Sequence, residues 1–196
     1  MKDLFDRVNI FSIVSSHKDT LYDYARFVKT GEKKTPFSDK FIFLIAPIIL
    51  SCLIVFVLKV YINQEYLNII ITALSIFVGL LFALLTLVFD LIKKEKNEIL
   101  KLPVKESHKF KLLQELFINI SFSILLSILT ILFSLLTQIN PKGIIPLLKK
   151  IPYYQILKCL YLDLSNIIAV TLIFIFLMTL LMILKRFFII FNTEIK

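Results

Sequence analysis

The sequence predicts an all-helical polytopic membrane protein, and three observations carry this fold class. The mean hydropathy is +0.87, and 58% of the 196 residues are hydrophobic whereas only 19% are charged; soluble domains contain about a quarter of charged residues. Four segments reach the length of about 20 apolar residues that a helix needs to cross the hydrocarbon core of a bilayer. None of the apolar stretches 41–58, 66–89, 116–137 and 164–184 contains a charged residue. The lipid bilayer is therefore the first expected partner.

The four expected transmembrane helices lie at 41–63, 66–89, 116–137 and 164–184, the first with its apolar part at 41–58. The segments 1–40, 90–115 and 185–196 contain 8, 7 and 3 Lys and Arg residues, 18 together, whereas 59–65 and 138–163 contain 1 and 4. Because Lys and Arg near membrane spans are retained in the cytosol, both termini and segment 90–115 are expected to be cytosolic. The net charge of +9 then reflects membrane orientation, and direct nucleic-acid binding is not expected.

Residues 1–40 predict two short amphipathic cytosolic helices and a linker. A capping box at Ser16 and Asp19 is expected to start the second helix, and Gly31 to end it. The apolar faces of both helices need a partner, which is the bilayer surface, segment 90–115 of the same chain, or another protein. The docking face of the second helix comprises Leu21, Tyr24 and Val28.

Segment 90–115 is expected to be a cytosolic helical hairpin. The helical spacing of apolar residues continues past Asp90 until Pro103 ends it. At about 1.5 Å per residue, a helix over 66–102 would be a rod of roughly 55 Å, longer than the bilayer core. An apolar ridge close to the tip predicts a docking site for a soluble cytosolic protein, and it comprises Ile99, Leu100 and Leu102.

Segment 138–163 is expected to be a periplasmic loop. It contains Pro141, Gly143, Pro146 and Pro152, which interrupt regular structure. The apolar run between these residues, followed by tyrosines, is typical of a short helix in the membrane interface. A re-entrant loop is the less favoured alternative, because its buried backbone would have to be satisfied by the protein itself.

Two neighbouring spans each carry a stripe of small and hydroxyl-bearing residues. Steps of three or four residues keep each stripe within an arc of about 80°. One interpretation is close helix packing, since small residues let backbones approach in lipid. The other is that the third-span stripe faces the axis of a homo-oligomer and lines a water-accessible path, while the second-span stripe packs. The third-span stripe is Asn119, Ser123, Ser127, Thr130, Ser134 and Thr137, and the second-span stripe is Asn68, Thr72, Ser75, Gly79, Ala83, Thr86 and Asp90.

Several classes of function are disfavoured by what the expected spans lack. No Asp, Glu, Lys, Arg or His lies in 41–58, 66–89, 116–137 or 164–184, and residues of these types inside a membrane mark proton relays and ion-coupled transport. No nucleophile is accompanied by a base at membrane depth, so an enzyme is not expected. The two cysteines form no CxxC or Cys/His cluster, so neither a metal site nor a cofactor is expected. His17 and His108, each within a Ser-His-Lys triplet, are interpreted as surface histidines at helix starts or as a shared ligand or pH-responsive cluster.

The order of segments resembles the small four-span membrane subunits of bacterial antiphage defence systems. The resemblance covers a short structured N-terminal piece with Ser15-Ser16-His17-Lys18-Asp19-Thr20-Leu21, then 36–39 leading into four spans. Similarity to the Kiwa membrane sensor implies an oligomer that senses infection and holds a soluble DNA-binding partner at the inner membrane. Similarity to the Hailong membrane effector implies an oligomeric pore held shut by a nucleotide ligand. Neither resemblance assigns a functional residue.

Three hypotheses for the function follow. The first is a homo-oligomeric sensor or scaffold of the bacterial inner membrane that docks a soluble cytosolic protein from the same operon. The second is a ligand-gated channel that depolarises the cell, and the third is a small immunity or accessory membrane protein. A closed symmetric ring is the usual form of a homo-oligomer, and a tetramer is expected.

Overall fold

In the computed structural model, residues 10–22, 41, 45–57, 64–99, 108–138 and 154–194 are described. Their elements are α2 (Ile10–Asp19), α5 (Ala46–Cys52), the π-helical turn η2 (Leu53–Val57), α6 (Gln64–Ile99), α7 (His108–Gln138) and α9 (Tyr154–Glu194). This part of the chain is all-helical, without a strand. Three of its helices, α6, α7 and α9, are long and apolar enough to cross a membrane.

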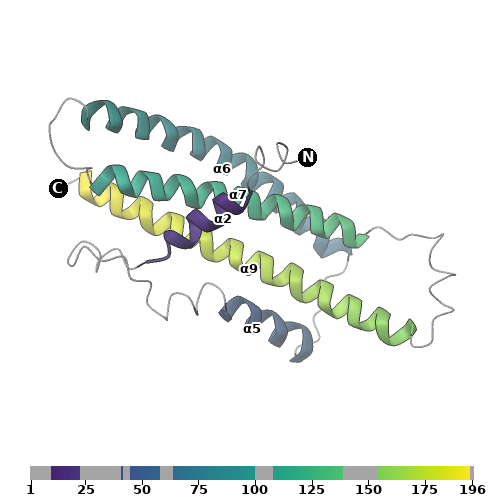
Figure 1. The fold of residues 1–196 in the computed structure, drawn as a ribbon. Helices are drawn as coiled ribbons and strands as arrows, with labels where there is room; N and C mark the ends of the chain where they lie inside the picture. Colours follow the sequence, from purple (N-terminus) through teal and green to yellow (C-terminus); the bar gives the residue numbers. More distant parts are fainter. Residues whose placement is uncertain are drawn as a thin grey trace, which may run out of the picture.

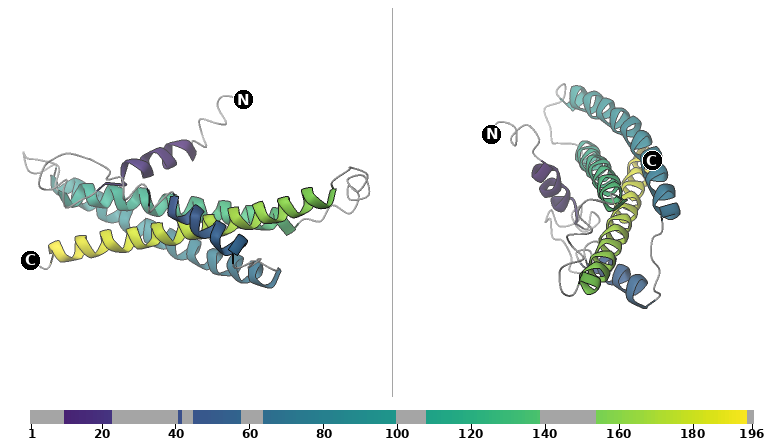
Figure 2. Two further views of the ribbon diagram at one scale, coloured as in Figure 1. Left: turned by 90° about the horizontal axis from the view of Figure 1, so that it is seen from below. Right: turned by 90° about the vertical axis from the view of Figure 1, so that its right-hand side faces the viewer.

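The three long helices lie side by side, with α7 in the middle (Figure 1). Helix α7 contacts α6 on one flank and α9 on the other, while α5 and η2 lie against α9. The short helix α2 crosses α7 on the outside of this layer, as both views of Figure 2 show. Helix α7 is therefore covered on more sides than any other long helix.

The apolar core lies along α7. Helices α6 and α9 each contribute core residues at steps of seven, a spacing that keeps side chains on one helical face. Helix α7 contributes residues from several faces because it has neighbours on both flanks. The core comprises Leu74, Leu81 and Val88 of α6, Leu112, Leu113, Leu116, Ile120, Ile124 and Leu126 of α7, and Phe176, Ile183 and Ile190 of α9.

Large apolar side chains also cover the outer faces of the long helices. Ile76 and Leu80 of α6 are exposed, as are Leu181 and Leu184 of α9. Exposed apolar surface on this scale needs a covering, and lipid acyl chains supply one. The pattern agrees with a protein of the membrane.

The end of α6 agrees with the sequence prediction, whereas α9 is longer than the apolar segment it contains. Helix α6 continues beyond Asp90 to Ile99, as the sequence predicts. Helix α9 begins at Tyr154 and reaches Glu194, so the helix extends beyond the apolar segment 164–184 at both ends. No proline follows Pro152, and therefore nothing interrupts backbone hydrogen bonding along α9. The interfacial helix expected between the prolines lies outside the described residues.

The first apolar segment is shorter than a complete span where it is described. Helix α5 has 7 residues and η2 has 5, which together reach about 18 Å at 1.5 Å per residue. Pro47 lies in the first turn of α5, where its missing N–H removes no intrahelical bond. The rest of 41–63 lies largely outside the described residues.

Candidate functional site

The turn that follows α2 attaches the N-terminal segment to the long helices. Helix α2 runs through Ser16 to Asp19, so the predicted capping box at Ser16 is wrong and Ser16 is inside a helix. The backbone N–H of Thr20 donates to the carbonyl of His17 (3.0 Å), and the N–H of Leu21 donates to that of Lys18 (3.1 Å). These bonds close the helix and bring His17, Thr20 and Tyr22 against α7 and α9.

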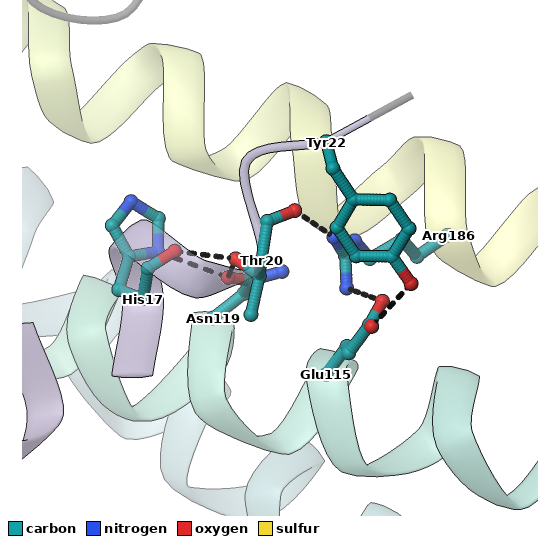
Figure 3. A network of polar contacts seen from close by, with 6 residues as sticks. All are labelled: His17, Thr20, Tyr22, Glu115, Asn119 and Arg186. Atoms are coloured by element: carbon teal, nitrogen blue, oxygen red, sulfur yellow. Dashed lines mark hydrogen bonds and ion pairs between the residues drawn. The ribbon is translucent and has the colours of Figure 1, made fainter. Parts of the chain in front are cut away.

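Asn119 of α7 contacts His17 and Thr20 of this turn. The Oδ1 atom of Asn119 lies 2.9 Å from Nδ1 of His17 and accepts a hydrogen bond of 2.8 Å from the hydroxyl of Thr20 (Figure 3). The imidazole of His17 is stacked on the ring of Phe122, with centroids 3.8 Å apart and an angle of 6° between the planes. His17 and Asn119 are both buried, with 6% and 0% of their surface exposed.

The amide of Asn119 has a second hydrogen-bonding arrangement open to it. Its Nδ2 atom is buried and has no partner among the described residues, while the Thr20 hydroxyl has a single hydrogen for Oδ1 and for the carbonyl of His17 at 2.7 Å. Turning the amide by 180° would direct Nδ2 toward the Thr20 hydroxyl and toward Nδ1 of His17 as acceptors. That arrangement requires neutral His17 with its proton on Nε2.

A buried ion pair forms the other half of the network. The guanidinium of Arg186 on α9 donates to Oε2 of Glu115 on α7 (2.6 Å) and to the backbone carbonyl of Thr20 (2.6 Å). The hydroxyl of Tyr22 donates to Oε1 of the same carboxylate. Glu115 and Arg186 are 5% and 7% exposed. Both carboxylate oxygens thus have donors, which is the condition under which a buried ion pair offsets its loss of hydration.

His17 is a neutral imidazole at physiological pH. Burial lowers the pKa of His17 from 6.5 to about 4, the hydrogen bond with Asn119 partly opposes this shift, and the positive charge of Arg186 adds to it. The structure therefore contradicts the interpretation of His17 as a surface histidine at a helix start, because His17 is buried near the end of α2. His108 is the first residue of α7, and its side chain lies outside the described residues.

The third-span stripe is an internal packing seam. The hydroxyl of Ser123 donates to Oγ1 of Thr179 on α9 (3.0 Å), and the hydroxyls of Ser127 and Thr130 donate to carbonyls one turn earlier on α7. This placement contradicts the hypothesis that the stripe faces the axis of an oligomer, because helices of the same chain cover it. Thr137 is in α7 but its side chain lies outside the described residues; the buried members are Asn119, Ser123, Ser127, Thr130 and Ser134.

The second-span stripe, in contrast to the third-span stripe, lies on an exposed face of α6. Three of its hydroxyls donate to carbonyls four residues earlier on α6, at 2.8 to 3.0 Å, and so are satisfied without a neighbour. A Cβ atom added at Gly79 would meet nothing within 4 Å. Helix α6 therefore presents a small-residue face that the rest of the described chain does not cover. Its exposed members are Asn68, Thr72, Ser75, Gly79, Ala83, Thr86 and Asp90.

The predicted docking residues are only partly described. Leu21 is buried beside Tyr22 at the α2 turn, so it belongs to an internal contact. Ile99 is the last residue of α6, and its side chain lies outside the described part of the chain. Tyr24, Val28, Leu100 and Leu102 also lie outside the described residues.

Sequence reasoning missed the four residues that complete the network with His17 and Asn119. One signal was present for two of them: Glu115 directly precedes the apolar segment 116–137, and Arg186 follows 164–184 by two residues. Charges at the same membrane level on neighbouring helices are able to pair. Nothing in the local pattern distinguished the other two, Thr20 and Tyr22.

Comparison of the chain with protein-family models, with curated proteins and with solved structures found no match.

Proposed function

We propose that the protein is a homo-oligomeric sensor or scaffold subunit of a bacterial antiphage defence complex in the inner membrane. Both termini and the end of the α6–α7 hairpin face the cytosol, and 41–63 adds a fourth span to α6, α7 and α9. A soluble protein from the same operon docks on this hairpin and on the N-terminal segment. The split of 18 to 5 between Lys and Arg on the two sides supports this orientation.

The observation that carries the proposal is the polar network between the α2 turn and two long helices. Thr20 contacts both helices, through its hydroxyl to Asn119 of α7 and through its carbonyl to Arg186 of α9. A partner that displaces the turn therefore removes hydrogen bonds from both helices at once. Because buried polar groups without partners are costly, the helices would respond by changing their packing. This coupling is what a sensor needs between a cytosolic event and its membrane part.

The exposed stripe of α6 supports self-association. Ser75, Gly79 and Ala83 follow one another at steps of four residues, the small-xxx-small pattern that lets two helices approach closely in lipid. All three face away from the chain's own core. A second copy of α6 is the partner that this face fits, because the same face on two copies can pair about a twofold axis.

The same stripe favours a ligand-gated channel as the second candidate. In a ring, the hydroxyls of Thr72, Ser75 and Thr86 would line a path with Asn68 and Asp90 toward its two ends. A hydroxyl-bearing wall is suited to water and ions. Unlike the sensor or scaffold, this candidate must conduct ions across the membrane.

One set of experiments separates the two candidates. The native operon is expressed with tagged protein, and soluble proteins that co-purify are compared between the parent and Thr20→Val, which removes the hydroxyl bond to Asn119 and keeps the Arg186–Glu115 ion pair. Loss of a specific operon-encoded partner in the variant supports the sensor, whereas co-purification at equal yield contradicts the coupling. Ion flux is then measured in liposomes with purified parent and with Ser75→Leu. Flux in the parent that Ser75→Leu abolishes supports the channel, and a parent without flux excludes it under those conditions.

A further inference from the structure

A cavity of about 280 Å³ lies beside the Arg186–Glu115 ion pair, between α7, α9 and the α2 turn. Its volume is well above the roughly 30 Å³ that one water occupies in the liquid. Apolar side chains form most of the wall, and Met178, Leu181 and Met182 of α9 are among them. Lys185, Tyr22 and the ion pair also line it, as do Leu112 and Ile189. The cavity thus has charged groups next to an apolar wall.

The order of these residues along α9 places the cavity relative to the membrane. Met178, Leu181 and Met182 belong to segment 164–184, which has no charged residue, and Lys185 and Arg186 are the first charges that follow it. Ile189, which also lines the cavity, lies beyond these charges on α9. The cavity therefore crosses the boundary between hydrocarbon and membrane interface. An occupant that satisfies both the charged groups and the apolar wall must be amphiphilic.

The charge of the lining indicates the sign of the polar group. Arg186 is occupied by Glu115 and by the Thr20 carbonyl, and its charge is balanced by the carboxylate. Lys185 is exposed and has no ion-pair partner within the described part of the chain. The lining thus has one uncompensated positive charge, which favours an anion.

We propose that this cavity binds an anionic phospholipid of the cytosolic leaflet, with the phosphate at Lys185 and the upper part of an acyl chain against Met178 and Met182. Basic pockets between helices on the cytosolic side of a membrane bind anionic headgroups. Methionine side chains adapt to a flexible chain because they are unbranched and polarisable. The inference rests on the proposed orientation, which places Lys185 on the cytosolic side.

Lipid binding would also act on the polar network. Thr20, Leu21 and Tyr22 of the α2 turn line the same cavity as Lys185. A ligand that contacts both the turn and α9 stabilises the docked state of the turn by mass action. Anionic lipid is thereby a ligand that holds the N-terminal segment against the long helices.

The test measures lipid binding to the purified full chain in a neutral detergent. Phosphatidylglycerol, phosphatidylcholine and inorganic phosphate are titrated separately, with bound lipid counted by native mass spectrometry and the shift in melting temperature recorded. Phosphatidylglycerol is expected to bind and to stabilise, and Lys185→Gln to weaken its affinity about fivefold, the effect of one lysine near an anionic surface. Lys96→Gln is the matched control. Lys96 is exposed near the C-terminal end of α6, which the proposed orientation places on the same cytosolic side as Lys185, and it does not line the cavity.

A second variant, in the apolar wall of the cavity, tests lipid binding without changing a charge. Met182→Trp fills the space beside this wall and is expected to reduce binding of phosphatidylglycerol while leaving Lys185 in place. Equal affinity for the two lipids, or full binding by Lys185→Gln, overturns the proposal; stabilisation by inorganic phosphate alone assigns the site to a soluble anion instead. Since binding is measured without any protein partner, failure here leaves the sensor proposal standing, and absence of a partner leaves the lipid site standing.

Discussion

Glu115 and Arg186 are separated by 71 residues in the chain, yet a nitrogen of the guanidinium lies 2.6 Å from the carboxylate. Each residue stands at the edge of an apolar segment, Glu115 where α7 enters its segment and Arg186 where α9 leaves its own. The pair therefore sets how far α9 is displaced along α7. The turn after α2 is held by the same two side chains, so one contact determines both helix register and the position of the N-terminal segment.

Removing one partner of this pair is expected to destabilise the protein strongly. Arg186→Met leaves the carboxylate of Glu115 buried without its counter-ion, and such losses cost about 3 to 5 kcal/mol. The double variant Glu115→Met with Arg186→Met leaves no unpaired charge and is expected to be more stable than Arg186→Met alone. Thermal unfolding in detergent, followed by circular dichroism, measures the parent, the two single variants Arg186→Met and Glu115→Met, and the double variant. A double variant that loses the sum of the two single losses would show that the residues are not coupled.

Acidification is expected to weaken the docking of the α2 turn. The pKa of His17 is about 4 in the folded state and 6.5 in the unfolded chain, so the unfolded state binds more protons between these values. The contribution of neutral His17 is complete above pH 6.5 and is lost as the pH falls toward 4. At pH 5 the loss is about 2 kcal/mol.

The comparison that isolates His17 uses His17→Gln. The free energy of unfolding is measured at pH 7.5 and at pH 5.0 for the parent and for the variant. The part of the pH dependence that disappears in His17→Gln belongs to His17, because Glu115 and His108 are present in both proteins. A variant with the same pH dependence as the parent contradicts the buried neutral imidazole.

Bulky substitutions in the two stripes are expected to have different effects. Ser127 is 0% exposed on α7, so Ser127→Leu overpacks a buried position and costs about 1 to 3 kcal/mol of stability. Ser75 is exposed on α6, so Ser75→Leu is expected to leave the stability of a subunit unchanged and to reduce oligomer size. Melting temperature and light scattering after size-exclusion chromatography measure the two quantities. Equal loss of stability in both variants would mean that α6 also packs inside the subunit.

Reporter fusions test the proposed orientation. Fusions after Lys34, at Lys101 and after Asn192 are expected to be active as cytoplasmic reporters, because 18 of the 23 Lys and Arg residues lie on their side. A fusion at Lys142 is expected to report from the periplasm. A periplasmic signal at Lys101 would invert α6 and α7 and exclude a cytosolic hairpin.

The all-helical fold and the three long membrane-type helices followed from local properties of the chain. Apolar runs of sufficient length can satisfy their backbone in lipid only as helices or closed barrels, and the helical spacing past Asp90 predicted the continuation of α6 to Ile99. These features depend on residues within a few turns of one another. They are therefore readable without knowing the neighbours of any helix.

The site depended on contacts that no local pattern contains. The stripes of α6 and α7 have the same spacing, but only the α7 stripe is buried, because α7 is the helix with neighbours on both flanks. Apolar side chains do not indicate which face is inward, since lipid is as apolar as the protein core. His17 reaches Asn119 across 102 residues and Arg186 reaches Thr20 across 166. Only the packing of α2, α7 and α9 brings these polar groups together. Their burial turns His17, which stands in an ordinary Ser-His-Lys triplet of the sequence, into part of a structural contact.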